Sequence, residues 1–168
     1  KARKLQKDGN WKEAFEACEK LALDPGSDPK QVGNDLQQAV QYLQRINRNP
    51  ESDDLRERVI TVHTNNWRLL QVAARSYFQD NHHGFLVAGE FHRGHHRGGG
   101  TAVNALELDR ARALQLMDQA MRLEFPEEDK HDRAEFNLEF ARMFMGYRGY
   151  HEAWRLQDLT DLSDLPDY

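Results

Sequence analysis

The feature that most constrains this chain is an alanine followed three positions later by a large residue, recurring at long intervals. The pairs are Ala2–Leu5, Ala39–Tyr42, Ala74–Tyr77 and Ala141–Phe144, and their alanines are spaced 37, 35 and 67 residues apart. A small residue lets a facing helix approach closely, and the large one fills the space beside it. A step in the mid-thirties with two helices per unit is typical of a helical solenoid. The pattern therefore predicts an all-α chain of antiparallel helix pairs.

The 168 residues are predicted to form one domain of four such units. We place the units at about 1–27, 28–64, 65–126 and 127–168. The long last step is explained by an insert at 81–105 inside the third unit. The chain begins in the middle of a pattern and without a methionine, so we expect a fragment of a longer protein.

Apolar periodicity and turn residues place the expected helices within these units. The chain is predicted to begin with the end of a helix at Lys1–Lys7, followed by a helix from Trp11 to before Pro25. The next helix is opened by Asp28 as N-cap with Pro29, and a shorter helix is capped by Ser52. Further helices are expected after Asn66, from Leu106, and as a final pair at Asp132–Phe144 and Tyr150–Leu159. The helix opened by Asp28 has an apolar stripe formed by Val32, Leu36, Ala39, Val40 and Leu43. The helix capped by Ser52 carries Leu55, Val59 and Val62.

The insert at 81–105 loses the helical period and is rich in glycine and histidine. Its five histidines are His82, His83, His92, His95 and His96. Neutral imidazole binds zinc, copper and nickel, which makes His92, His95 and His96 weak candidate ligands. The signature of two histidines four apart with a glutamate between them is absent, so we predict no metal site. We expect an exposed or docked loop instead, with His92, Arg93, His95, His96 and Arg97 available to a partner.

Composition excludes several classes of function. The formal net charge of −5 argues against nonspecific nucleic-acid binding, and no apolar run has the length of a membrane span. The lone Cys18 excludes an internal disulfide framework and is expected to be a packed thiol. Acidic runs such as Asp53-Asp54 are expected to be solvated near helix starts. No nucleophile or acid–base motif occurs, so we expect neither an enzyme nor a cofactor.

With Ala141, Phe144, Tyr150, Ala153 and a closing Pro166, the last unit resembles the tetratricopeptide repeat of about 34 residues. The first unit resembles it next best, through Ala2, Leu5, Gly9, Trp11, Ala14 and Pro25. No unit matches the repeat fully, and an irregular helical bundle remains the alternative. The resemblance implies a right-handed superhelix of about four helix pairs whose first helices line a concave groove.

In that superhelix the same register gives the groove residues. They are Arg68, Gln71, Arg75 and Gln79 in the third unit and Glu135, Leu138, Arg142 and Gly146 in the last. An arginine there is able to bind a carboxylate of a peptide or partner loop bidentately. The alternative is that these residues are ordinary solvated helix faces.

A second resemblance is to the helical region preceding the macroglobulin domains in some large bacterial alpha-2-macroglobulin-like proteins. The stretches that carry it are Trp67–Leu70, Gly84–Gly94, His96–Gly100, Arg112–Met117, Gly149-Tyr150 and Trp154–Gln157. It implies an accessory module of an exported protease-trapping protein, periplasmic or on the cell surface, with downstream domains as partners. The thioester and bait segments of such proteins are not in this chain.

Together these observations predict a non-catalytic protein–protein interaction or scaffolding module within a larger protein. Its partner is expected to be a protein or peptide, including downstream domains of the same chain, without nucleic acid or direct membrane insertion. The alternative is a helical domain that binds a metal or small ligand through the histidine-rich insert.

Overall fold

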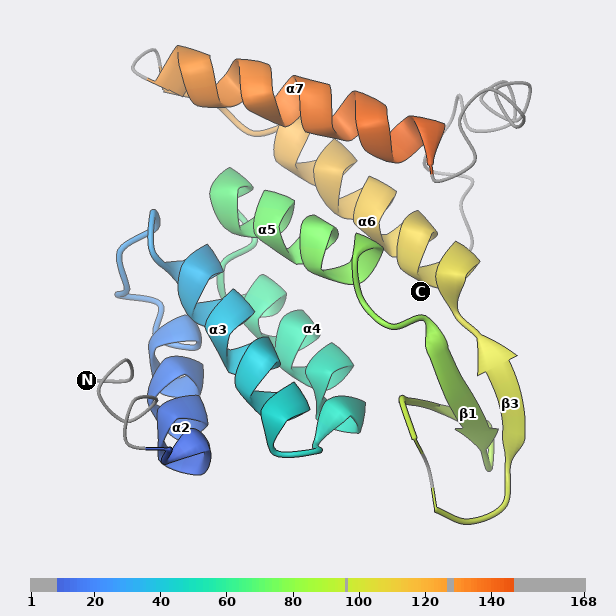
Figure 1. The fold of residues 1–168 in the computed structure, drawn as a ribbon. Coiled ribbons are helices and arrows are strands. Elements are labelled where there is room, and N and C mark those ends of the chain that lie inside the picture. Colours follow the sequence, from blue (N-terminus) through green and yellow to red (C-terminus); the bar gives the residue numbers. More distant parts are fainter. Residues whose placement is uncertain (1–8, 96, 127–128, 147–168) are drawn as a thin grey trace.

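The computed structural model describes residues 9–95, 97–126 and 129–146, and these are mostly helical (Figure 1). The described elements are α2 (Trp11–Ala22), α3 (Val32–Arg45), the 3-10 turn η1 (Asn49–Glu51), α4 (Ser52–Val62), α5 (Trp67–Phe78), β1 (His83–Val87), β2 (Glu90–Arg93), β3 (Thr101–Asn104), α6 (Leu106–Met121) and α7 (Lys130–Met145). The helices expected at 1–7 and 150–159 lie outside the described residues. Within the described residues, no helix has both the length and the apolar character needed to cross a membrane.

The helices pack as neighbours along the chain (Figure 1). α2 lies against α3, α3 contacts both α4 and α5, and α5 runs antiparallel to α6 along most of its length. α7 lies beside α6 at the outer edge of the described fold, and the small sheet projects from the end of the α5–α6 pair where α5 ends and α6 begins.

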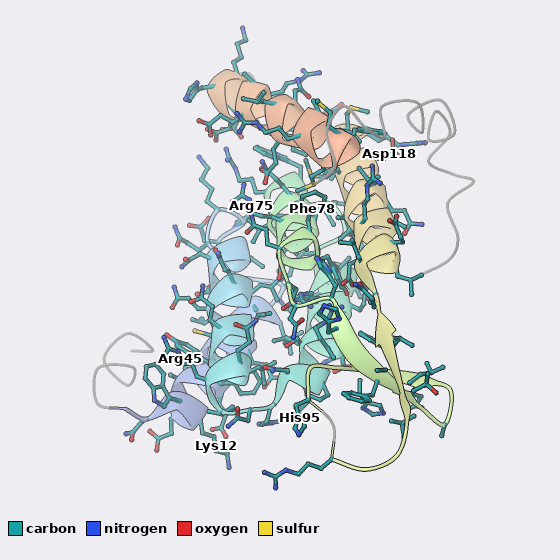
Figure 2. All side chains as sticks on the ribbon, turned by 45° about the vertical axis from the view of Figure 1, so that its right-hand side comes forward. Lys12, Arg45, Arg75, Phe78, His95 and Asp118 are labelled. Atoms are coloured by element: carbon teal, nitrogen blue, oxygen red, sulfur yellow. The ribbon has the colours of Figure 1, made fainter. Side chains whose placement is uncertain are left out.

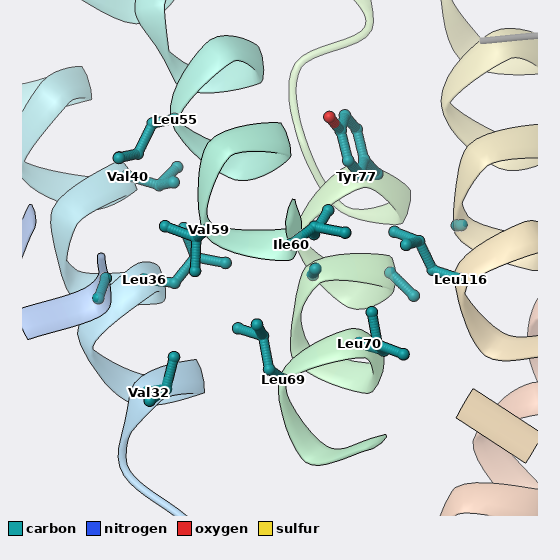
Figure 3. Packing of buried hydrophobic residues seen from close by; sticks show 14 of the residues in the cluster. Val32, Leu36, Val40, Leu55, Val59, Ile60, Leu69, Leu70, Tyr77 and Leu116 are labelled. Carbon is teal, nitrogen blue, oxygen red and sulfur yellow. The ribbon is translucent and has the colours of Figure 1, made fainter. Parts of the chain in front are cut away.

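One continuous apolar core joins these helices (Figure 3). The stripe predicted for α3 is confirmed, since Val32, Leu36, Ala39, Val40 and Leu43 are all buried. Leu36 and Val40 meet Val59 and Leu55 of α4, while Leu70 of α5 faces Leu116 of α6. Fully burying one such aliphatic side chain stabilises the fold by about 1.5–3 kcal/mol, so this core is the main source of stability.

A cluster of aromatic rings holds α7 on the rest of the fold. Phe136 of α7 has its ring centre 6.2 Å from that of Trp67 at the start of α5 and 5.4 Å from that of Phe125. The series continues along α7 through Phe140 and Phe144, whose ring centres are 4.8 Å apart. Phe136 is completely buried. These rings fix the position of α7 relative to α5.

The expectation of an all-α chain is wrong in one segment, because the insert forms a three-stranded antiparallel sheet in the order β2-β1-β3. β1 and β2 are joined by the two-residue turn Ala88-Gly89, and both turn residues have positive φ, 51° and 90°. Such a turn matches the twist of paired strands and favours glycine. At Gly84 an added Cβ would lie 2.4 Å from the His92 backbone oxygen, so glycine is required there. The segment is therefore an ordered hairpin with a third strand.

Two predicted helix details are also wrong. α3 begins at Val32 and not at Pro29, because the Asp28 side chain accepts a hydrogen bond from the Lys30 backbone N–H in a turn before the helix. Ser52 is the first residue of α4 and not its cap, since the chain already turns through η1. Val62 belongs to α4, as predicted, and as the last residue of the helix it is 39% exposed. The start of α5 was predicted correctly, and the Asn66 side chain caps it by accepting from the Leu69 N–H.

Candidate functional site

A groove of about 450 Å³ lies between α5 and α7. Its lining residues are Arg75, Phe78, Gln79, Glu135, Leu138, Glu139, Arg142 and Met143. Five of the residues predicted to line the groove of a superhelix are therefore brought together, namely Arg75, Gln79, Glu135, Leu138 and Arg142. Figure 2 shows Arg75 and Phe78 on the part of α5 that lies beneath α7. The groove combines apolar residues with charged ones.

Within the groove, Arg75 and Glu139 join α5 to α7. The Arg75 Nε–H and Nη2–H donate to the two carboxylate oxygens of Glu139, each at 2.6 Å, and Gln71 donates to the same carboxylate at 2.7 Å. Burial works against the charge of Glu139, but these hydrogen bonds and the charge of Arg75 outweigh it, so the pKa of Glu139 is lowered. The hydrogen bond to Glu139 likewise raises the pKa of Arg75.

This pairing changes the role predicted for two residues. The guanidinium of Arg75 and the amide of Gln71 already bind Glu139, and both neighbours of the carboxylate lie on α5. A bidentate arginine–carboxylate pair is strong and directional. Arg75 therefore shapes the groove as part of its wall. Arg142 is exposed on α7 and also lines the groove, where its charge lowers the pKa of Glu139 further.

A second, smaller hollow of about 160 Å³ continues from the groove along α3 and α5. Arg75 and Gln79 line both hollows, so the two share a border. Three exposed glutamines of α3, Gln37, Gln41 and Gln44, line the α3 side. A glutamine amide both donates and accepts hydrogen bonds, as does a peptide backbone. The combined surface passes over α3, α5 and α7.

Two other predicted residues, Arg68 and Gly146, do not line the groove. Arg68 makes contacts elsewhere. Its guanidinium contacts Asp129 at 2.6 Å and Asp132 at 2.5 Å, and it stacks 4.3 Å above the Trp67 ring. It ties the start of α5 to the segment before α7 and to the first turn of α7.

A buried ion network lies where the sheet meets the helices. Arg93 of β2 is only 2% exposed and donates to both oxygens of Asp109 of α6, at 2.7 and 2.8 Å. It also contacts Asp53 of α4 at 3.0 Å and donates to the Asn81 carbonyl at 2.8 Å. Burial opposes the charge on Arg93, but the hydrogen bonds and charges of the aspartates outweigh it and raise its pKa. Arg93 was predicted to lie in an exposed or docked loop; instead it is a core residue.

A second buried arginine belongs to the same network. Arg56 of α4 is fully buried, contacts Asp53 at 2.6 Å and also pairs with Asp80 at the end of α5. Its guanidinium lies 4.7 Å from the Tyr77 ring centre. The expectation that Asp53 is solvated is wrong, since its carboxylate lies between two arginines, whereas Asp54 is exposed. The network joins α4, α5, β2 and α6.

The insert histidines are dispersed. His82 contacts Asp109 through Nδ1 at 2.7 Å, His92 lies on β2 opposite Phe85, and His95 is exposed after β2. Arg97 is exposed, and His96 lies outside the described residues. Among the residues that the structure describes, no group of three or more histidine, cysteine, aspartate or glutamate side chains is arranged to hold a metal ion. Cys18 is buried, as predicted, and burial raises the pKa of its thiol to about 11.

Part of what sequence reasoning missed had a signal in the helical period. Arg56 occupies a core position in the series Ser52, Leu55, Arg56, Val59 and Ile60, and Asp109 precedes Ala113 and Leu116 on the buried face of α6. A charged residue in an apolar stripe indicates a buried partner. Glu139 gave no such signal, because its partner is 64 positions away along the chain.

Comparisons of the chain with known protein families, with curated proteins and with solved structures find no match for it.

Proposed function

We propose that this chain is a non-catalytic protein-interaction module whose groove over α3, α5 and α7 binds a segment of another protein or of a downstream domain. The observation that carries the proposal is the composition of the groove. Phe78 and Leu138 supply apolar area, and amide and charged groups surround them. Apolar anchoring with a polar rim is the ordinary composition of a protein interface.

The order of the helices supports the finer proposal of a tetratricopeptide-like repeat. In that arrangement α3, α5 and α7 are the first helices of successive units, and α4 and α6 are second helices. The groove residues come from α3, α5 and α7, which are the helices that would line the concave face. The sheet is then an insertion between the two helices of one unit, which pack against each other although 27 residues separate Phe78 from Leu106.

The narrower proposal is that the module serves an alpha-2-macroglobulin-like protein as an accessory domain. Its support is the resemblance of Gly84–Gly94 and Arg112–Met117 to the helical region of those proteins. The groove partner would then be a domain of the same chain.

Titration with peptides tests the groove. The full chain is screened against an array of overlapping peptides that covers macroglobulin-like downstream domains and a set of unrelated sequences. Binders are then measured by calorimetry against Gln79→Trp and Gln41→Trp, which fill the hollow at exposed positions.

Loss of binding by at least about tenfold in both variants, with Lys12→Trp unchanged on distant α2, supports the groove. Peptide affinity that is unchanged in both groove variants contradicts the proposal that the groove is the binding site. An array in which no peptide binds also contradicts the proposal that a linear segment occupies the groove.

A further inference from the structure

Among the residues that the structure describes, α7 lies at the edge of the fold and has two apolar faces, of which one packs on the described core. The inner face, with Phe136, Phe140 and Met143, is buried. On the outside of the helix a second apolar series is exposed, at intervals of four, three and four residues. We call it the outer stripe; its members are Ala134, Leu138, Ala141 and Met145. Leu138 is 52% and Met145 50% exposed. This spacing is the seam of a two-helix coiled coil.

The order of sizes within the outer stripe is self-complementary. Small and large residues alternate along it: alanine, leucine, alanine, methionine. When a second α7 runs antiparallel, centred between Glu139 and Phe140, Ala134 lies opposite Met145 of the second copy and Leu138 lies opposite its Ala141. Every layer then pairs a small residue with a large one, which fills space evenly. A parallel pair would place alanine against alanine and leave gaps.

The charges beside the outer stripe favour the same pairing. Glu135 and Arg142 each directly follow an alanine of the stripe, so they flank it on one side. In the antiparallel arrangement Glu135 of one copy lies next to Arg142 of the other, and symmetry makes this contact twice. Opposite charges at such flanking positions set the orientation of helix pairs. The size pattern and the charge pattern are independent observations that agree.

We propose that α7 is a homodimerisation helix, through which two copies of this chain associate by antiparallel packing of their outer stripes. This inference goes beyond the proposed interaction function and does not depend on it. Leu138, Glu135 and Arg142 line the groove as well as the proposed seam, whereas Ala134, Ala141 and Met145 belong to the seam and do not line the groove. The helix is about 24 Å long, and a single helix pair buries less area than a standard interface, so the dimer is weak and reversible.

Sedimentation velocity on the full 168-residue chain tests the association. Concentrations from about 1 µM to about 1 mM cover weak, reversible interfaces. We expect a concentration-dependent dimer that Ala141→Glu weakens by at least about tenfold, because it buries a charge in the seam. The control is Leu21→Glu on α2, where an exposed apolar residue is likewise replaced by a charge, but away from α7. Circular dichroism establishes that each variant is folded.

Charge reversal tests the orientation separately. Glu135→Arg and Arg142→Glu each place like charges together across the dimer, and each is expected to weaken it. The combined variant restores the opposite-charge contacts and is expected to recover the original dissociation constant within about threefold.

Three outcomes overturn the proposal. In the first, the full chain remains a monomer at every concentration. A dimer that forms only after deletion of 147–168 counts as the same outcome, because the full chain then does not associate. In the second, a dimer forms but Ala141→Glu leaves its dissociation constant unchanged, which places the interface elsewhere. The double charge reversal remains as weak as the single variants, which excludes the antiparallel register.

Discussion

Arg93 on the second strand and Asp109 on the following helix bind each other through two hydrogen bonds of 2.7 and 2.8 Å, with both side chains almost fully buried. The contact closes the sheet onto α6, and Asp53 extends it to α4. The insert is thus joined to the helices through charged side chains, because no residue of the three described strands belongs to the buried apolar core. The pair therefore holds β2 against α6.

Arg93→Ala is expected to destabilise the fold by about 3–5 kcal/mol, because it leaves Asp109 buried without its guanidinium partner. Urea unfolding monitored by circular dichroism measures the loss. Arg97→Ala is the matched control, since Arg97 belongs to the same insert but is exposed, and its change should be within about 0.5 kcal/mol. Equal stabilities of the two variants would show that the network contributes little.

The contrast between α3 and the sheet shows what the sequence was able to predict. The α3 stripe repeats the helical period over three turns, so its buried residues could be assigned one by one. The strands have only four or five residues each, and their alternation is obscured by glycine and histidine. The two-residue turn at Ala88-Gly89 was the available signal for a hairpin.

For the groove, the sequence could predict which residues share a helix face but not which helices face each other. Helical register correctly grouped Arg75 with Gln79, and Glu135 with Arg142, because residues four or seven apart share a helix face. It did not reveal that α5 and α7 face each other, since that depends on how Trp67, Phe125 and Phe136 pack. Glu139 and its pairing with Arg75 follow from that packing and not from local sequence.

Gly33→Ala is expected to destabilise the chain by about 1–3 kcal/mol, despite the better helix propensity of alanine. The new Cβ would lie 2.9 Å from the Val72 Cγ2 atom, where α3 crosses α5. Thermal unfolding measures the change, and Val72→Ala in the same chain should recover part of it by making room. Gly99→Ala, which meets no atom within 4 Å, is the control. A stabilised Gly33→Ala variant would contradict the close crossing.

Cys18 is expected to react slowly with thiol reagents while the chain is folded. Its thiol is 1% exposed, and burial, aided by the charge of Asp35, raises its pKa to about 11. Only the thiolate reacts, and at pH 8 the folded chain holds roughly a hundredfold less of it than an ordinary cysteine. A chromogenic disulfide reagent measures the rate with and without urea. Rapid reaction of the native chain would contradict the packing of α2 on α3.

The contact between Arg75 and Glu139 is expected to make the stability of the α5–α7 contact depend on pH. Because the pKa of Glu139 is lowered in the folded chain, its ion pair stabilises the fold above the ordinary glutamate pKa, about 4.3. That stability is lost as the pH falls through the lowered pKa of the folded state. Urea midpoints at pH values from about 7 to about 3, compared between the unmodified chain and Glu139→Gln, measure the contribution.

The Glu139→Gln variant should be less stable at neutral pH and should approach the unmodified chain on acidification. Arg75→Gln should reduce the same pH dependence, and the double variant should lose little beyond either single change, because one pair accounts for both effects. Parallel pH profiles for the unmodified chain and Glu139→Gln would show that the pair is not maintained in solution. Additive losses in the double variant would show that the two side chains act separately.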